Sequence, residues 1–356
     1  MNIKSPHRFT PFQGIFRRFL VVVIVAVGSL GMATGCASDK QVIAQAQNMH
    51  SGLEEAVITD PQLAGYLQQV GDRIISSAQD LSRQGYGESK KDREWMFDAK
   101  SMQFHFVNSD TLNAFTTGGN HMYIYTKLFQ TAKSEDELAA VMAHEFAHIY
   151  GRHVQGGMNR QYAIIAAAAA AGAGGYALGG SEKGGEYAGY GAGLGLLAGQ
   201  FVGMGFTRKD ETSADEMGFQ FYVRAGWDPE KFDDFFQAMI DSGLDQGNEM
   251  LSDHPSMSNR VAAIKKWVSE LPPDAKNWRK PPVANAKTVK QLQARSVAVG
   301  KNMPSDKSLE NTKELLAALP RSCLTPVIQE DQKTAEEKVM LKAQASQQQQ
   351  GQSQTR

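Results

Sequence analysis

The feature that most constrains the chain is a short apolar stretch, AVMAHEFAHIYGRHV at residues 140–154, which contains three histidines and one glutamate. An α-helix advances about 100° per residue, so His144 and His148 would lie about 40° apart on one face. Two imidazoles placed in this way can bind a single cation. Glu145 would lie on the adjoining flank, within reach of a water on that cation, which is the His-Glu-x-x-His arrangement of zinc hydrolases. The alternative is a helix with ordinary surface histidines.

The third histidine of the stretch, His153, does not share this face. It would lie about 180° around a continuous helix from His144, so it could join the pair only through a break at Gly151. We therefore expect His153 to be a helix-end or packing residue.

A catalytic zinc usually needs a third protein ligand, and an acidic segment further along the chain can supply it. In FTRKDETSADEMG, Glu211 and Asp215 are four residues apart and would lie on one face of a helix. The small Ala214 between them would permit close approach. Glu211 would complete a His-His-Glu set, and Asp215 would accept a hydrogen bond that sets the tautomer of a ligand histidine. Taken alone, the segment could also be an acidic, solvated helix face.

Three motifs, in this order, resemble the signature of the gluzincin metallopeptidases, a family that includes HtpX, the CAAX prenyl proteases, mitochondrial Oma and the periplasmic proteins LoiP and BepA. The resemblance covers residues 39–271. The motifs are His144-Glu145-x-x-His148, Arg208-x-x-Glu211-x-x-Ala214-Asp215 and His254-Pro255-x-x-x-x-Arg260.

The resemblance implies one zinc ion per chain, held by three protein ligands. These ligands would be His144, His148 and Glu211. It further implies that Glu145 is the catalytic base and that Asp215 lies behind the ligands. The enzyme would then be a zinc metalloendopeptidase.

The resemblance also implies roles around the substrate. His254 and Arg260 would lie near the substrate or the transition state, where either could stabilise an oxyanion. In some relatives the histidine at the position of His254 can approach the metal and block it, which would make this enzyme latent. The segment containing Asn113, Ala114 and Phe115 would form an edge strand that binds an extended peptide through main-chain hydrogen bonds.

The expected fold class is α+β and mainly helical: a zincin-like metallopeptidase domain, with a small antiparallel sheet and the histidine-bearing helix. Apolar periodicity and capping residues predict helices over residues 61–80, 210–225, 229–242 and 256–271 and another that begins after Ser134. Alternating apolar runs on either side of Gly118-Gly119-Asn120 predict the strands. Residues 162–206, rich in Ala and Gly, would form a helical hairpin, which either contacts a membrane or packs against the catalytic helices.

The amino-terminal residues predict export. Basic residues precede the apolar run Phe19–Ala33, which is short for a membrane-spanning helix, and Ala33-Thr34-Gly35-Cys36 resembles a bacterial lipobox. We therefore expect a lipoprotein signal peptide over residues 1–35 and lipidation of Cys36, with ordinary cleavage nearby or an uncleaved anchor as alternatives. The only other cysteine is Cys323, so acylation of Cys36 would rule out an intramolecular disulfide.

The rest of the sequence predicts the domain boundaries, and the charge balance argues against nucleic acid as a partner. The metallopeptidase domain is expected over residues 36–275, followed by a linker and short helical extension over 276–330 and a low-complexity, disordered tail over 331–356. Because 37 basic residues face 38 acidic ones, the chain has no excess positive charge with which to bind nucleic acid.

These observations predict a zinc endopeptidase that acts on misfolded or envelope proteins at the periplasmic face of the cell envelope. Ala37, rather than aspartate, follows Cys36, which favours sorting of the lipid-anchored protein to the outer membrane over the inner membrane. Outer-membrane assembly components are candidate partners, although the tail lacks the tetratricopeptide repeats of BepA-type proteins. The alternative is a chaperone-like or assembly-factor module with a latent, gated zinc site and little turnover.

Overall fold

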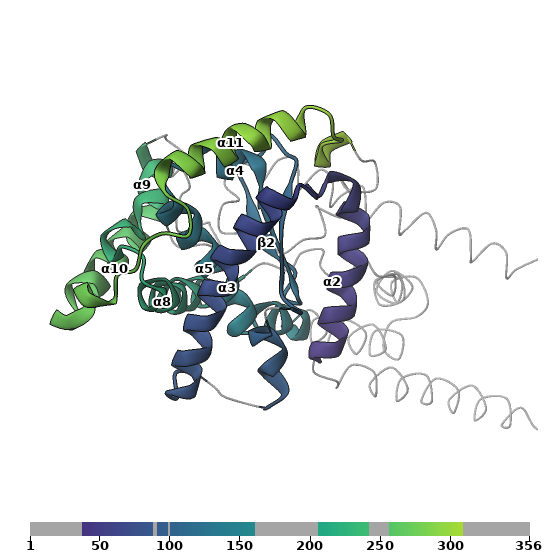
Figure 1. The fold of residues 1–356 in the computed structure, drawn as a ribbon. Helices are drawn as coiled ribbons and strands as arrows, with labels where there is room; N and C mark the ends of the chain where they lie inside the picture. Colours follow the sequence, from purple (N-terminus) through teal and green to yellow (C-terminus); the bar gives the residue numbers. More distant parts are fainter. Residues whose placement is uncertain (1–37, 88–90, 99, 161–205, 242–255, 309–356) are drawn as a thin grey trace, which may run out of the picture.

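The computed structural model describes residues 38–87, 91–98, 100–160, 206–241 and 256–308. Within them the chain is mainly helical, with one small sheet (Figure 1). The elements in chain order are α2 (Asp39–Leu53), η1 (Glu54–Ala56), α3 (Pro61–Arg83), η2 (Lys91–Phe97), β1 (Gln103–Val107), β2 (Ala114–Thr116), β3 (His121–Tyr125), α4 (Thr126–Thr131), α5 (Glu135–Tyr150), α8 (Arg208–Ala225), η4 (Pro229–Lys231), α9 (Asp234–Asp241), α10 (Met257–Ser269), η5 (Pro273–Trp278), α11 (Ala286–Gly300) and η6 (Asp306–Ser308).

The sheet is mixed, so the prediction of an antiparallel sheet was wrong for one of its two pairings. The strand order is β1-β3-β2; β2 is antiparallel to β3, but β1 is parallel to β3. The predicted turn at Gly118 does join β2 to β3, and its φ of +73° suits glycine. Alternation of apolar and polar residues reports which face a side chain occupies, and it carries no information on strand direction.

One face of the sheet packs on the main apolar core, which lies between the sheet and helices α3, α5 and α8. Helix α3 approaches the sheet closely because Gly71 has no side chain. A Cβ at that position would lie 2.2 Å from the ring of Phe104 on β1. The sheet and α3 together form the platform on which α5 is held.

Helix α2 covers the opposite face of the sheet and forms a second, smaller core (Figure 1). Val42, Met49 and Leu53 of α2 pack there against Phe115 and Tyr123 of the sheet. The helix starts at a capping box, in which Ser38 accepts from the backbone N–H of Gln41 and the Gln41 side chain accepts from Ser38. The sheet is therefore enclosed by helices on both faces.

The caps predicted for the main helices are confirmed. Asp60 accepts from two backbone N–H groups at the start of α3, with Pro61 in the first turn. Ser134 accepts from the backbone N–H of Glu137 at 3.3 Å and starts α5. Helix α8 begins two residues earlier than predicted because Thr207 caps it, with Asp210 as its partner.

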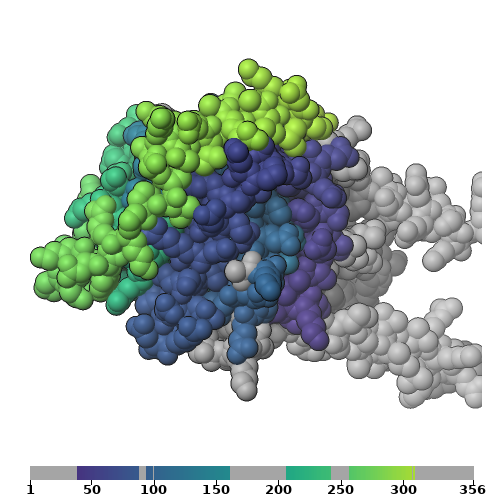
Figure 2. All heavy atoms as spheres, viewed as in Figure 1, coloured from purple at the N-terminus to yellow at the C-terminus, as the bar shows by residue number. Residues whose placement is uncertain are grey.

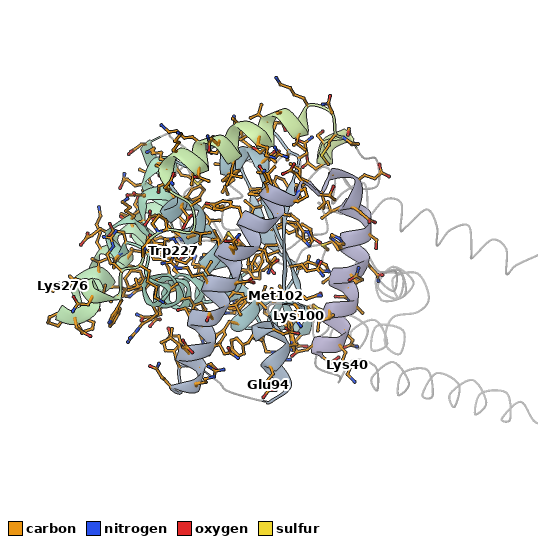
Figure 3. The ribbon with its side chains drawn as sticks, viewed as in Figure 1. Lys40, Glu94, Lys100, Met102, Trp227 and Lys276 are labelled. Carbon is orange, nitrogen blue, oxygen red and sulfur yellow. The ribbon has the colours of Figure 1, made fainter. Side chains whose placement is uncertain are left out.

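Residues after 275, the predicted end of the first domain, pack on the helices and sheet described above. Helix α11 lies across α3 and α4, and its atoms form the upper surface in the view of Figure 2. Glu135, at the start of α5, accepts 2.7 Å hydrogen bonds from the backbone N–H groups of Val283 and Ala284 and a 3.0 Å bond from Trp227. Trp227 lies inside the helical part of the molecule, whereas Lys40 and Lys276 point outward (Figure 3).

Several predictions fall outside the described residues. They are the lipidation site Cys36 with its signal segment, almost all of the Ala/Gly-rich hairpin, the residue His254, and the helix and tail after residue 308. Within the described ranges, no helix is both long and apolar enough to span a membrane.

Candidate metal centre

The two histidines of the central helix converge as their spacing predicts. His144 and His148 are both almost fully buried, and their Nε2 atoms lie 3.0 Å apart. The ring planes are 75° apart, with centroids separated by 4.8 Å, so the two rings do not stack. Phe206 stacks on the His148 ring with centroids 3.8 Å apart, which shields that ring from solvent.

The third ligand candidate comes from α8. The carboxylate of Glu211 is fully buried, with Oε2 at 3.7 Å from His144 Nε2 and Oε1 at 3.7 Å from His148 Nε2. Helix α8 can come this close to α5 because Gly218 has no side chain. A Cβ there would lie 3.0 Å from the backbone N and Cα of His144.

A hydrogen-bond network behind the ligands sets their protonation. His144 Nδ1 lies 2.9 Å from Asp215 Oδ1. Burial alone would raise the pKa of Asp215, but the nearby Arg260 charge and hydrogen bonds from His144 and Arg260 hold it below the ordinary value. An ionised Asp215 can only accept, so His144 donates to it from Nδ1, which leaves Nε2 on the side of His148 and Glu211.

The donor set therefore fits a metal ion. The site contains the Nε2 atoms of His144 and His148 and two Glu211 oxygens, and the three residues offer ligand atoms within 4.8 Å of one another. Nitrogen and carboxylate ligands in a His-His-Glu set are typical of catalytic zinc sites. A cation between them would bind these atoms.

Glu145 lies beside this set and is also buried. Burial, together with the negative charge of Glu211, raises the pKa of Glu145 well above its ordinary value. The charge of Arg260 and a hydrogen bond from the backbone N–H of Thr116 act in the opposite direction. A carboxylate with a raised pKa is suited to take up a proton near neutral pH and to release it again.

The predicted peptide-binding segment forms β2, and β2 is at one edge of the sheet. The backbone N–H of Tyr125 donates to the carbonyl of Asn113, so the main-chain groups of Asn113 point toward β3. By the alternation of an antiparallel pair, those of Ala114 and Thr116 point away from β3. The Phe115 side chain packs on Tyr123 under α2, so only the main chain of β2 is placed to meet a substrate.

Comparison with known proteins agrees with this geometry. Residues 62–268, more than half of the chain, match peptidase family M48. The chain belongs to peptidase family M48. It is 29% identical over 222 residues to the beta-barrel assembly-enhancing protease of Escherichia coli, covering 61% of this chain and 41% of that protein. It is also 29% identical over 172 residues to the mitochondrial metalloendopeptidase OMA1 of Schizosaccharomyces pombe, covering 47% of each.

Residues 62–268 are therefore a metallopeptidase domain of family M48, with a zincin-like fold. The chain spans about two fifths of the length of the bacterial relatives that it matches. The matched segment contains every ligand candidate described above, whereas α2 and α11 lie outside it.

Arg260 lies next to Asp215, behind the three ligand candidates. Its guanidinium binds Asp215 at two points, Nη2–Oδ1 at 2.6 Å and Nε–Oδ2 at 2.8 Å, and stacks over Phe236 with Cζ 4.0 Å from the ring centroid. It is 3% exposed. This placement differs from the expected position beside the substrate, and it favours a role in orienting His144 through Asp215.

His153 reaches the site, although a continuous helix would have carried it to the far side. Helix α5 ends at Tyr150, and Arg152 adopts a left-handed φ of 56°, which turns the chain back. An ion pair between Arg152 and Asp39 holds this turn. His153 Nδ1 then lies 3.0 Å from His148 Nδ1. The glycine at 151 was the sequence signal for this break.

His153 thus has the same relation to His148 as Asp215 has to His144. Burial lowers the pKa of His153, so its ring is neutral and its Nδ1 can accept the proton of His148 Nδ1. That hydrogen bond leaves the His148 Nε2 lone pair directed at the metal position.

Replacing His153 by alanine is expected to lower zinc affinity about 10-fold to 100-fold, because the partner that orients a metal-binding histidine is lost. Competition with a chromophoric chelator measures the change. His153→Gln, whose amide oxygen can accept the same hydrogen bond, should retain more affinity than His153→Ala. Equal zinc affinity in wild type and His153→Ala would show that His153 is only a packing residue.

Proposed function

We propose that this chain is a zinc-dependent endopeptidase that cleaves unfolded or misfolded proteins of the cell envelope. The observation that carries the proposal is the convergence of His144, His148 and Glu211 on one position, with Glu145 on its flank and the edge strand β2 next to Glu145.

Each residue then has a defined task. His144, His148 and Glu211 would hold zinc, which supplies Lewis acidity to a water and to the scissile carbonyl. Glu145 would accept a proton from the attacking water and donate it to the leaving amine. Asp215, oriented by its two-point contact with Arg260, holds the His144 ring in the ligand tautomer.

The edge strand supports an extended, unfolded substrate. The outward main-chain groups of Ala114 and the carbonyl of Thr116 can pair with a peptide backbone, and such pairing is largely independent of the peptide sequence. The Thr116 N–H lies against Glu145, so a peptide on this edge would pass beside the base. A folded protein offers few extended segments for this kind of pairing.

The cell-envelope location is supported by sequence and by the relatives. The segment before Cys36 has the pattern of a lipoprotein signal, which would place a lipid-anchored enzyme on the periplasmic face, with the outer membrane favoured. Bacterial relatives that match 61% of this chain are named beta-barrel assembly-enhancing proteases. We therefore propose β-barrel proteins of the outer membrane, before they fold, as the substrate class, and their assembly components as candidate partners.

A digestion experiment tests this function. Purified mature protein is incubated with an outer-membrane β-barrel protein, either unfolded in urea and diluted or folded in detergent, and with unfolded casein as a general substrate. Internal cleavage of both unfolded proteins is expected, with the folded barrel intact. A chelator should stop cleavage and added zinc should restore it. Chelator-resistant cleavage, or no cleavage of any unfolded protein, would contradict the proposal.

The same experiment, with a His254→Ala variant added, tests whether the enzyme is latent. If His254 blocks the metal, His254→Ala should cleave the unfolded substrates faster than wild type. If wild type and His254→Ala cleave at equal rates, gating by His254 is excluded. If neither cleaves but both bind unfolded barrel protein, the chaperone-like alternative replaces the peptidase function.

A further inference from the structure

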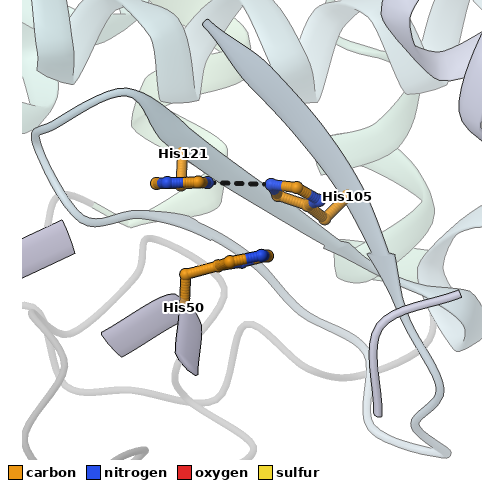
Figure 4. Close-up of side chains that lie close together, drawn as sticks. All are labelled: His50, His105 and His121. Atoms are coloured by element: carbon orange, nitrogen blue, oxygen red, sulfur yellow. Dashed lines mark hydrogen bonds between the residues drawn. The ribbon is translucent and has the colours of Figure 1, made fainter. Parts of the chain in front are cut away.

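A second group of three histidines lies on the opposite face of the sheet from the catalytic residues. His50 is on α2, His105 on β1 and His121 on β3. Each offers a ring nitrogen, and these nitrogens lie within 4.8 Å of one another. Figure 4 shows His105 and His121 directed at each other from the two strands, with His50 facing them from α2. The residues are far apart in the sequence, and the fold brings them together.

The closest nitrogens in this cluster are as near to each other as those of the catalytic pair. His105 Nε2 and His121 Nδ1 are 2.9 Å apart, compared with 3.0 Å between the Nε2 atoms of His144 and His148. The parallel pairing of β1 with β3 sets this approach, because it holds the two strands side by side with His105 and His121 on the same face. A metal ion would replace the proton between these nitrogens.

An outer hydrogen bond fixes the remaining nitrogen of His121, and His50 has a hydrogen-bond partner in its present position. His121 Nε2 lies 3.3 Å from Gln47 Oε1, an acceptor only, so Nε2 carries the proton and Nδ1 has a lone pair toward the cluster. His50 Nδ1 lies 3.1 Å from the hydroxyl of Tyr123. Partners of this kind, on the nitrogen away from the metal, are typical of histidine ligands. They repeat the pattern of Asp215 and His153 in the catalytic site.

The cluster is held in the neutral state that binds metals. Burial, with repulsion from the other rings, lowers the pKa of His105 to about 3 and that of His121 to about 4. Burial also lowers the pKa of His50, with Glu54 acting in the opposite direction. Neutral imidazoles bind zinc, nickel and copper and do not suit magnesium or calcium, which prefer oxygen.

Of the three histidines, His50 is the one whose side chain would have to rotate to bind a metal. Its ring stacks on that of His121, with centroids 4.5 Å apart and planes at 11°. Since a lone pair lies in the plane of its ring, His50 must rotate its side chain, and give up its present contact with the Tyr123 hydroxyl, to bring a nitrogen to the other two. It is only partly buried, whereas His121 is 1% exposed, so His50 has more room to rotate than His121.

We propose that His50, His105 and His121 form a second transition-metal site, for zinc or another ion that prefers imidazole ligands, and that this site links α2 to the sheet. The site would be structural. Helix α2 also begins at Asp39, which binds the turn of Arg152 and accepts from Gln155 at 3.3 Å. A metal at the far end of α2 would therefore stabilise the helix whose start holds His153 at the catalytic centre. The alternative is a hydrogen-bonded stack of histidines that binds no ion.

Metal stoichiometry tests the proposal on the full mature protein. After dialysis against zinc buffered by a chelator, elemental analysis should find two zinc ions per wild-type chain. His50→Phe keeps an aromatic ring over His121 but removes the ligand, and it should retain one zinc. His105→Gln should also retain one. Both variants should still cleave casein in a chelator-sensitive way, which shows that the fold and the catalytic metal are intact.

Other results would overturn the second site. One zinc in wild type, unchanged in His50→Phe and His105→Gln, would show that the histidines only stack. Two zinc ions in His50→Phe, with one in His105→Gln, would show a site that does not include α2 and would exclude the link between α2 and the sheet. Cleavage of casein is measured separately, so the loss of the second zinc does not bear on the peptidase proposal.

Discussion

Replacing Glu145 by glutamine is expected to lower kcat/KM for unfolded casein by about 10²-fold to 10⁴-fold, the range typical for loss of a general acid or base. Glutamine has nearly the same shape and can still occupy the buried position beside Thr116, but it cannot take a proton from water. Its neutral amide also removes the repulsion between the carboxylates of Glu145 and Glu211. Zinc content should therefore be unchanged or higher in the variant.

Steady-state cleavage of a fluorescent casein measures the effect, with zinc content determined on the same samples. Glu216→Gln is a matched control, because Glu216 is an exposed glutamate one residue beyond Asp215 on α8. It should cleave at the wild-type rate. A Glu145→Gln variant that binds zinc and cleaves within a factor of a few of wild type would remove Glu145 from the chemistry.

Replacing Arg260 by alanine is expected to destabilise the fold by about 3–5 kcal/mol, the cost typical of leaving one member of a buried ion pair without its partner. Asp215 is 2% exposed, and the charge of Arg260, together with hydrogen bonds from His144 and Arg260, holds its pKa low against burial. Urea unfolding followed by circular dichroism measures the loss.

A double variant distinguishes the ion pair from general packing. Asp215→Leu with Arg260→Met removes both charges and should be more stable than Arg260→Ala alone, because no buried charge is left unpaired. The two single losses would then be strongly non-additive. A double variant that is less stable than wild type by the full sum of the two single losses would contradict this account.

The same Arg260 variant separates two roles for the residue. If Arg260 orients His144 through Asp215, zinc affinity should fall about 10-fold to 100-fold, as is typical when a residue supporting a ligand is lost. If instead it contacts the substrate oxyanion, kcat would fall with zinc affinity intact. Arg260→Lys keeps the charge but loses the two-point contact, and it should recover stability more fully than zinc affinity.

The two histidine ligand candidates on α5 could be predicted from the sequence alone. The spacing of His144 and His148 places both on one face wherever a helix forms, and Ser134 marks where this helix begins. Glu211 could be predicted only in part, because an acidic helix face has the same local pattern as a ligand. What distinguishes the two is the contact between α5 and α8 at Gly218, which is a tertiary feature.

Other features could not be predicted from the sequence, because they depend on the tertiary structure. The direction of β1 relative to β3 left no local signal, since a strand has the same alternation in either direction. The return of His153 depends on the left-handed turn at Arg152, and the ion pair that holds it comes from Asp39, more than a hundred residues earlier. The second histidine cluster joins α2 to two strands. No spacing rule connects His50 with His105 and His121.

The most direct test of the central claim is anomalous diffraction at the zinc absorption edge from crystals of the mature protein. The account predicts a peak between α5 and α8 with His144 Nε2, His148 Nε2 and a Glu211 oxygen each about 2.0–2.2 Å away. The absence of a peak there, or a zinc bound by His148 and His153 without Glu211, would contradict it.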